Sequence, residues 1–211
     1  MPKTYLFITC CVNNKVGVND PSMRKNQYFL AISNVLSAIP KDVIPVIIEN
    51  SCDGSSYLDV FNCKIIYTKD NEFQLNGDYI EHKGYAELRS IKKAIEILNI
   101  DDNDMIVKLT GRYLLFKDDI FKLVEKCPNK DAFLRYFNVM TYESNEYDMV
   151  LGLFALRCKY FKIFEYLEVD VGAEEAFVTN INNYIPQDKI MKLNKLWLRC
   201  FINDTNKMID C

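Results

Sequence analysis

Short apolar runs alternate with longer amphipathic segments along this chain. Strands are predicted at residues 5–12, 43–48, 63–68, 105–109, 132–140 and 150–157, and helices at residues 23–39, 85–98, 116–126, 159–167 and 174–183. Residues 190–202 mix large apolar and polar side chains and are expected to pack against the core. This alternation is typical of a sheet covered by helices. We therefore predict an α/β fold with a central, mainly parallel mixed sheet flanked by helices.

The composition is that of a packed globular domain. The chain has 211 residues, of which 49% are hydrophobic and 26% charged, so a disordered or fibrous protein is excluded. No internal repeat or linker divides the sequence. We expect residues 1–211 to form one domain, either alone or as one module of a longer polypeptide. The net charge of −3 leaves no broad basic surface for a nucleic-acid backbone.

The cysteines and the apolar runs bear on the compartment. The eight cysteines include no CxxC pair, which favours buried free thiols over disulfides or a zinc site. His82 is the only histidine, so a multi-histidine zinc site is excluded. No apolar run approaches membrane-spanning length, and no secretory signal is present. We expect a cytoplasmic protein without a transmembrane segment.

Polar residues follow most of the predicted strands. In open α/β sheets, ligands bind beyond the carboxyl ends of the strands, near the point where the strand order reverses. The candidate binding segments are therefore the loops at residues 9–14, 49–51, 68–70, 76–78 and 108–113. Together these loops offer acceptors for a base and ribose, cations for phosphate and a carboxylate for a metal.

The segment after the fourth strand is the strongest local signal. Lys108 and Arg112 bracket Thr110 and Gly111, and a glycine permits a tight turn and close approach of the backbone to a ligand. The planar guanidinium of arginine suits phosphate oxygens. These residues predict a phosphate or sugar site. The alternative is that Lys108 caps the sheet edge and Arg112 pairs with a surface carboxylate.

Aspartates are the candidates for a metal site. Hard cations that neutralise a diphosphate prefer oxygen ligands, and Asp78 follows a glycine in a loop. A turn aspartate can instead bond its own backbone. The pair Asp102 and Asp104 has the DxD spacing, but it precedes its strand and so belongs to the opposite edge of the sheet. We interpret this pair as a solvated turn.

Glu174 and Glu175 open a predicted helix. Acidic residues at this position are favoured by the helix dipole, which is sufficient to explain them. A carboxylate here is also suited to accept a proton from an attacking sugar hydroxyl. Both interpretations remain open at the level of the sequence.

Three stretches together resemble one family of enzymes: residues 106–113, residues 83–88 and residues 49–51. They are similar to GT-A glycosyltransferases of microbial and viral surface-glycan synthesis, those of chloroviruses included, and the resemblance covers most of the chain. It implies a GT-A fold, a UDP-sugar donor such as UDP-glucose or UDP-rhamnose, Mn²⁺ or Mg²⁺, and a saccharide acceptor. A role in viral capsid glycan synthesis, in the cytoplasm of the host cell, is also implied.

The resemblance assigns roles to individual residues. The implied donor-binding set consists of Thr9, Cys11 and Asn13 beside the uridine, Glu49 and Asn50 beside base or ribose, and Lys83, Lys108, Thr110, Gly111 and Arg112 toward the diphosphate or donor sugar. Asp78 becomes the leading metal ligand, because the strand end that carries DxD in the wider family lacks it here. The implied catalytic residues are Arg112, Glu174 and Glu175. Retention of the anomeric configuration is favoured; an inverting reaction would use Glu174 or Glu175 as base.

Two other functions remain as alternatives. A non-catalytic module that binds a UDP-sugar or saccharide would use the same cleft. A nucleotidyltransferase shares the α/β layout but usually has a glycine-rich basic loop after the first strand. Residues 12–17 contain a single glycine, which favours glycosyl transfer.

Overall fold

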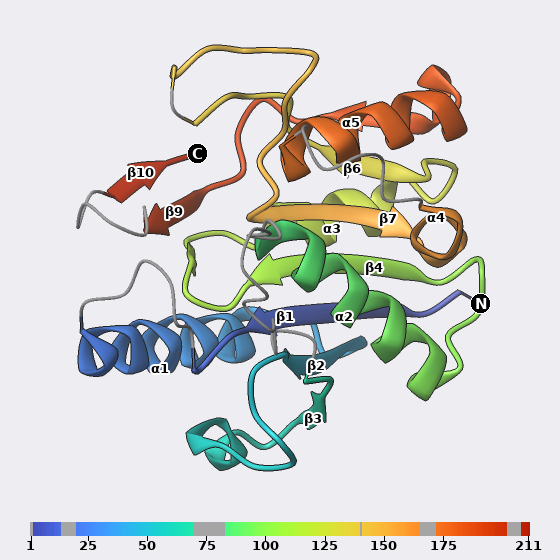
Figure 1. Cartoon of the computed structure of the whole chain (residues 1–211). Coiled ribbons are helices and arrows are strands. Elements are labelled where there is room, and N and C mark those ends of the chain that lie inside the picture. The colour runs from blue at the N-terminus through green and yellow to red at the C-terminus, as the bar shows by residue number, and fades with distance from the viewer. Residues whose placement is uncertain (1, 14–19, 70–82, 140, 165–171, 202–207) are drawn as a thin grey trace, which may run out of the picture.

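A central sheet with helices on both faces forms the body of the molecule (Figure 1). The computed structural model describes residues 2–13, 20–69, 83–139, 141–164, 172–201 and 208–211. The helices are α1 (Pro21–Ala38), α2 (Lys83–Leu98), α3 (Asp119–Lys126), α4 (Cys158–Ile163) and α5 (Ala173–Tyr184), with short 3-10 turns at Tyr57–Val60 and Gln187–Lys189. The strands are β1 (Thr4–Cys10), β2 (Val43–Glu49), β3 (Lys64–Tyr67), β4 (Met105–Thr110), β5 (Leu114–Leu115), β6 (Ala132–Leu134), β7 (Leu153–Arg157), β8 (Ile190–Lys192), β9 (Leu198–Phe201) and β10 (Met208–Asp210).

The strand order creates a reversal point at β1. Within the described residues, the main sheet has the order β3-β2-β1-β4-β7-β6-β8, and β7 alone runs antiparallel to its neighbours. The chain proceeds from β1 outward to β2 and β3, then returns to add β4 on the other side of β1. A smaller antiparallel sheet, β10-β9-β5, lies beyond the carboxyl end of β4. This arrangement confirms the predicted α/β fold with a mainly parallel mixed sheet.

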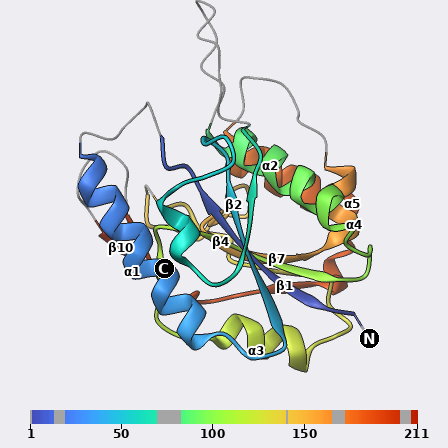
Figure 2. The same ribbon diagram turned by 90° about the horizontal axis from the view of Figure 1, so that it is seen from below.

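Both faces of the sheet are buried, which explains why its strands are continuously apolar. Helices α2, α4 and α5 cover one face, while α1 and α3 cover the other (Figure 2). Successive residues of β1 alternate between the two faces: Phe7 packs beneath α2, whereas Leu6 and Ile8 pack toward α1. Both positions of the two-residue strand period are therefore hydrophobic.

Three predicted segments differ most from the structure, and the strand predicted at 150–157 begins three residues late, at Leu153. The strand expected at 132–140 ends at Leu134, because the chain then leaves the sheet for a loop in which Asn138 bridges to Glu143. The helix expected from residue 116 begins at Asp119, since the backbone N–H of Phe116 still donates to the Trp197 carbonyl beside β5. The packing segment at 190–202 contributes two strands to two different sheets.

Two other expectations hold. Asp102 and Asp104 precede β4 at the amino-terminal edge of the sheet, where Asp104 accepts the Lys3 N–H at 2.7 Å and Asp102 pairs with Lys162 at 2.5 Å. The pair lies in a turn at the predicted edge, but the turn is not fully solvated, because Asp104 is buried. All eight cysteines are free thiols. Within the described part of the chain, no helix has the length and apolar character needed to cross a bilayer.

Candidate functional site

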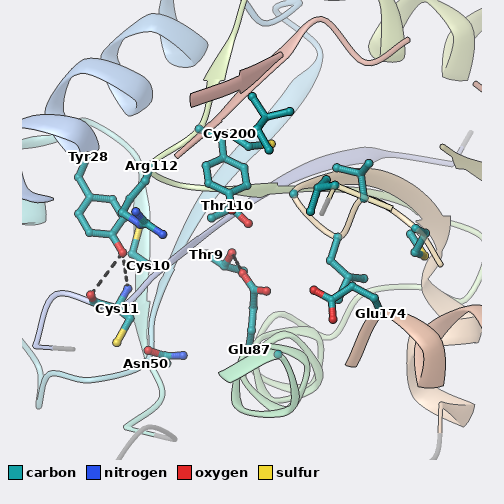
Figure 3. A pocket seen from close by; sticks show the side chains of 18 of the residues that line it. Thr9, Cys10, Cys11, Tyr28, Asn50, Glu87, Thr110, Arg112, Glu174 and Cys200 are labelled. Carbon is teal, nitrogen blue, oxygen red and sulfur yellow. Dashed lines mark hydrogen bonds between the residues drawn. The ribbon is translucent and has the colours of Figure 1, made fainter. Parts of the chain in front are cut away.

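A cavity of about 440 Å³ opens where the carboxyl ends of β1, β2 and β4 meet. This is the reversal point of the sheet, where α/β proteins of this kind bind ligands. Figure 3 shows Tyr28, Cys11, Asn50 and Arg112 toward one end of the cavity and Glu174 at the other, with Thr9, Thr110 and Glu87 between them. Residues from both sheets also contribute, including Cys200 of β9.

The loop after β1 is held by α1. Tyr28 accepts the Cys11 N–H at 2.8 Å and donates its hydroxyl to the Cys11 carbonyl at 3.3 Å. Arg24, four residues earlier on the same face of the helix, donates from Nε to that carbonyl at 3.0 Å and from Nη2 to the Tyr28 hydroxyl at 3.3 Å. Burial raises the pKa of Tyr28 well above its ordinary value, so the hydroxyl stays protonated. The end of β1 is therefore fixed before any ligand arrives.

Glu49 supports the same loop from β2. Its side chain is fully buried and accepts the Val12 N–H at 3.1 Å, the Ser51 N–H at 2.8 Å and the Ser51 hydroxyl. Burial raises the pKa of the carboxyl, and these hydrogen bonds oppose that rise. Asn13 joins the network because its backbone N–H donates to Ser51 Oγ at 2.8 Å. Glu49 lies behind the cavity wall, and its contact with a base or ribose stays a prediction.

Lys108 lies beneath the cavity floor. It is fully buried, and its ammonium donates to the Leu151 carbonyl at 2.6 Å and to Thr110 Oγ1 at 2.8 Å. It also forms an ion pair with Glu87 at 2.9 Å. Glu87 in turn accepts a hydrogen bond from the Thr9 hydroxyl. Thr9, Thr110 and Glu87 line the cavity above this ammonium, whereas the predicted contact of Lys108 with a diphosphate stays untested.

Gly111 and Arg112 form the turn that closes the floor. A Cβ on Gly111 would lie 2.6 Å from Cys10 Sγ and 3.0 Å from the Thr9 carbonyl oxygen, so only glycine allows the turn to pack against β1. Arg112 follows with a side chain that is 7% exposed and lines the cavity, and its Nη1 donates to Gln27 Oε1 at 3.3 Å. The guanidinium is thus placed in the cavity wall by the turn.

The two adjacent glutamates at the start of α5 have different positions. Glu174 lines the cavity and Glu175 does not. Glu174 is exposed to solvent, yet desolvation by the protein atoms around it raises its pKa, and the carboxylates of Asp148 and Glu87 raise it further. Glu175 is exposed on the helix surface. Of these two glutamates, Glu174 alone lines the cavity.

Some predicted residues cannot be placed. Asp78 and His82 lie outside the described residues, and Lys83 begins α2 with a side chain outside them. The cavity offers the carboxylates of Glu87, Asp148 and Glu174. Among the residues that the structure describes, no three His, Cys, Asp or Glu side chains gather as metal ligands.

Several cavity residues lie outside the segments that the sequence pattern selects. Arg24 and Tyr28 belong to α1, and Asp148 belongs to the loop before β7, all outside the strand-end loops. A signal did exist for Glu87: it lies four residues before Ile91 on the buried face of α2, so a carboxylate continues an apolar stripe. A charged residue on such a stripe requires a buried partner, which here is Lys108.

Comparisons with known proteins bear on the fold. No protein-family model and no curated protein matches the sequence. Among solved structures, one from Desulfovibrio desulfuricans G20 described as a nucleotide-diphospho-sugar transferase is 12% identical, with a TM-score of 0.56 over 92% of this chain and 80% of that one. A 4-diphosphocytidyl-2C-methyl-D-erythritol synthase is 10% identical, with a TM-score of 0.52 over 93% and 91%.

A third structure is of glucosyl-3-phosphoglycerate synthase from Mycobacterium tuberculosis, in complex with Mn²⁺, UDP and glucosyl-3-phosphoglycerate. It is 8% identical, with a TM-score of 0.50 over 90% of this chain and 69% of that one. At identities this low, the structural similarity shows the fold alone. The activity has to be argued from the site. The chain has the GT-A fold of the nucleotide-diphospho-sugar transferases.

Proposed function

We propose that this protein is a glycosyltransferase that moves a hexose, such as glucose or rhamnose, from a UDP-sugar to a glycan acceptor in viral surface-glycan synthesis. The observation that carries the proposal is the shared cavity at the reversal point of the sheet. It brings Asn50 after β2, Arg112 after β4 and Glu174 of α5 to one space. The amide of Asn50 suits a nucleoside, the guanidinium of Arg112 suits a diphosphate, and the carboxylate of Glu174 suits an acceptor hydroxyl.

The order of groups along the cavity supports an order of substrate parts. Asn50 and the loop at Cys11 lie at one end, which suits the nucleoside (Figure 3). The Arg112 guanidinium suits the diphosphate oxygens, and the hydroxyls and carboxylate of Thr9, Thr110 and Glu87 suit sugar hydroxyls. The carboxylate of Glu174 at the far end suits an acceptor hydroxyl. In this order, the bond from the sugar to the diphosphate lies between the Arg112 guanidinium and the Glu174 carboxylate.

In the transfer, the acceptor oxygen forms a bond to the anomeric carbon and the bond from that carbon to the diphosphate breaks. The leaving UDP carries away the electron pair of the broken bond. Arg112 stabilises the negative charge that develops on the diphosphate. The proton of the acceptor hydroxyl must pass to a base, and its destination is linked to the stereochemistry. Retention, favoured by the family resemblance, returns it to the leaving phosphate, whereas inversion delivers it to a carboxylate.

The cavity supports the inverting alternative. Glu174 lies in the cavity wall with its pKa raised, and a base works best when its pKa approaches the working pH. Glu175, the other candidate base, does not line the cavity. We therefore assign the proton to Glu174.

A divalent cation is compatible with the carboxylates of the cavity, Glu87, Asp148 and Glu174. Mn²⁺ and Mg²⁺ are commonly held by one or two carboxylates together with substrate phosphate oxygens, and the cavity offers carboxylates without a preformed cluster of three among the described residues. We propose Asp78 as the protein ligand, with the donor diphosphate completing the site. When bound, the ion supplies positive charge that neutralises the diphosphate.

The first test is turnover. With Mn²⁺ and a panel of UDP-sugars, the protein is expected to release UDP from at least one donor, and a glycan acceptor should increase the rate. Released UDP is measured by a coupled assay, with EDTA as the control for the metal. UDP binding without release from any donor would support the non-catalytic module. Diphosphate release from UTP and a sugar 1-phosphate would support the nucleotidyltransferase.

A second experiment tests Asp78 as the metal ligand. Asp78→Ala is expected to abolish the Mn²⁺-dependent part of UDP binding, measured by calorimetry with and without the ion. Asp102→Ala is the matched control, since Asp102 lies in the turn at the opposite edge of the sheet. Unchanged Mn²⁺-dependent affinity in Asp78→Ala would exclude Asp78 as a ligand.

The role of Glu174 predicts a difference between neighbours. Glu174→Gln is expected to lower kcat by about 100-fold or more, whereas Glu175→Gln should stay within about twofold of the wild type. Because the pKa of Glu174 is raised, its carboxylate is lost at a higher pH than usual as the pH falls. The acid limb of the kcat profile should therefore lie above the ordinary range for glutamate and disappear in Glu174→Gln.

Two measurements test whether Glu174 is the base: kcat and KM across pH, and the anomeric configuration of the product by NMR. A Glu174→Gln variant that changes only the acceptor KM, together with a retained configuration, would contradict Glu174 as the base.

A further inference from the structure

The small sheet turns one face to the cavity and the other to solvent. Along β9, Cys200 lines the cavity, whereas Arg199 and Phe201 lie on the opposite side, because successive side chains of a strand alternate. In the register of β9 and β10, Arg199 pairs with Asp210 and Phe201 with Met208. We call the solvent side of this sheet, with the residues that flank it, the outward face. It consists of Phe116, Lys117, Lys195, Trp197, Arg199, Phe201, Met208 and Asp210.

Large apolar side chains are exposed on the outward face. Phe116 is 50% exposed and Met208 is 56% exposed, while Trp197 is only partly buried. The Arg199 guanidinium carbon lies 5.0 Å from the centre of the Phe116 ring, which connects β9 to the segment after β5. A cluster of large apolar side chains at the surface indicates contact with another molecule or with a membrane.

Trp197 is held at this surface by a strained backbone. Its φ is 53°, in the left-handed region that a bulky side chain rarely adopts. The N–H groups of Leu196 and Leu198 both donate to the Cys211 carbonyl, at 3.2 and 3.1 Å, and the Phe116 N–H donates to the Trp197 carbonyl at 2.8 Å. Strain of this kind persists only where the surroundings enforce it, and it is common at functional sites. The fold thus fixes a partly exposed indole in place.

Cations surround the aromatic rings of the outward face. Lys117 Nζ lies 3.4 Å and Lys195 Nζ 4.0 Å from the centre of the Trp197 ring. Arg199 has the same relation to Phe116. Lysine and arginine stems can lie along apolar surface while their charged ends remain in water. The outward face therefore combines aromatic groups with positive charge.

The acidic residues beside these cations leave the outward face positive. Asp210 is the only acidic member of the set and is paired with Arg199 at 2.7 Å. Asp118, which begins the segment leading into α3, is paired with Lys122, and Asp119 follows it. Cations still outnumber carboxylates when both aspartates and Lys122 are counted. The protein as a whole has a net charge of −3, so an anionic surface would attract this face and repel the remainder.

A lipid bilayer with anionic headgroups matches both properties of the outward face. Tryptophan is favoured at the level of the headgroups, and basic side chains beside it are attracted to anionic lipid. We propose that the outward face docks the protein on an anionic bilayer, with Trp197 and Phe116 among the headgroups and Lys117 and Lys195 against lipid phosphates. Because Cys200 lines the cavity from the other side of β9, docking also sets the orientation of the cavity relative to the bilayer.

Two other occupants fit the outward face less well. In a twofold contact with a second copy of the chain, the cations would face one another, which is unfavourable. An acidic glycan that stacked on Trp197 would have to displace the two ammonium groups that lie over its ring. Both occupants are outcomes of the experiment below.

Trp197 is the only tryptophan of the protein, so its fluorescence reports the contact directly. The protein is mixed with vesicles of phosphatidylcholine that contain about 30% phosphatidylglycerol. We expect the emission to shift to shorter wavelength and to be quenched by brominated phospholipid in the same vesicles. Pure phosphatidylcholine vesicles should bind at least about tenfold more weakly, and added salt should weaken binding to the anionic vesicles.

Two variants test the outward face by co-sedimentation with the anionic vesicles. Trp197→Gly should weaken binding about tenfold or more, because the buried apolar area is lost. Glycine adopts the left-handed conformation without strain, so this variant should melt within a few degrees of the wild type. The double variant Lys117→Gln and Lys195→Gln should weaken binding by about 10- to 30-fold.

Matched controls remove similar side chains elsewhere. Lys41→Gln with Lys64→Gln removes two exposed lysines at the amino-terminal edge of the main sheet, and Tyr184→Ser removes an aromatic side chain that is 46% exposed at the end of α5. Vesicle binding should be unchanged in both. UDP affinity, measured by calorimetry, should be unchanged in every variant, because none of the substituted residues lines the cavity.

Several outcomes would overturn the proposal. These are the absence of an emission shift with anionic vesicles, equal binding to pure phosphatidylcholine, and wild-type binding by folded Trp197→Gly. An emission shift with polygalacturonate but not with vesicles would assign the outward face to an acidic glycan. A dimer in light scattering that Trp197→Gly dissociates would assign it to a second copy. Vesicle binding needs no nucleotide, so failure of UDP-sugar turnover would reject the proposed function without altering this result.

Discussion

Replacing Lys108 by methionine is expected to lower the free energy of unfolding by about 3–5 kcal/mol, the cost of breaking a buried ion pair by removing one partner. The substitution keeps most of the side-chain volume, so a large cavity does not contribute. It leaves the Glu87 carboxylate without its cation and the Leu151 carbonyl without its donor. Urea denaturation followed by circular dichroism measures the change.

Two variants show whether the buried charge is the cause. Lys122→Met removes a lysine from an exposed pair with Asp118 at the start of α3 and should lower the free energy of unfolding far less than Lys108→Met does, because solvent screens the pair. Adding Glu87→Gln to Lys108→Met removes the uncompensated carboxylate, and part of the lost stability should return. A loss below about 1 kcal/mol in Lys108→Met would mean that the ammonium is not paired in the core.

Arg112→Met is expected to reduce kcat/KM for the UDP-sugar by about 10² to 10³-fold, the usual loss when a preoriented donor to developing charge is removed. The guanidinium lines the cavity on a turn that Gly111 packs against β1. Its replacement by an apolar side chain removes positive charge where we propose that the diphosphate leaves. Steady-state kinetics of UDP release measure the loss.

Arg199→Met is the matched control for this variant. Arg199 pairs with Asp210 at 2.7 Å on the surface of the small sheet and does not line the cavity. Its activity should stay within about twofold of the wild type. A folded Arg112→Met variant with unchanged kcat/KM would remove Arg112 from the mechanism, and the cation at the leaving group would have to come from elsewhere.

The predictions for Lys108 and Arg112 separate an effect on stability from an effect on activity, which the sequence pattern alone does not distinguish. Both residues belong to one short segment after the fourth strand, and both were assigned to the donor. The structure directs the Arg112 side chain into the cavity wall and the Lys108 side chain beneath the floor. Lys108 should therefore affect stability most, and Arg112 activity most.

The sequence by itself determined the class of fold and the edge of the sheet that carries the site. Apolar periods of two and of 3.6 residues depend on neighbours along the chain, so β1, β2, β4 and α2 could be predicted within a few residues. The carboxyl-end rule then selected Asn50 and Arg112. It also excluded the Asp102–Asp104 pair, because a strand has a direction that its sequence position reveals.

Only the tertiary structure decided which polar side chains face the cavity. Lys108 shares a sheet face with Ile106, but its partners Glu87 and Leu151 come from α2 and from the segment before β7. Arg24 reaches the site from the first turn of α1, where nothing local marks it. The direction of a long side chain depends on charges and carbonyls that folding brings from distant segments, and those contacts have no periodic signal in the sequence.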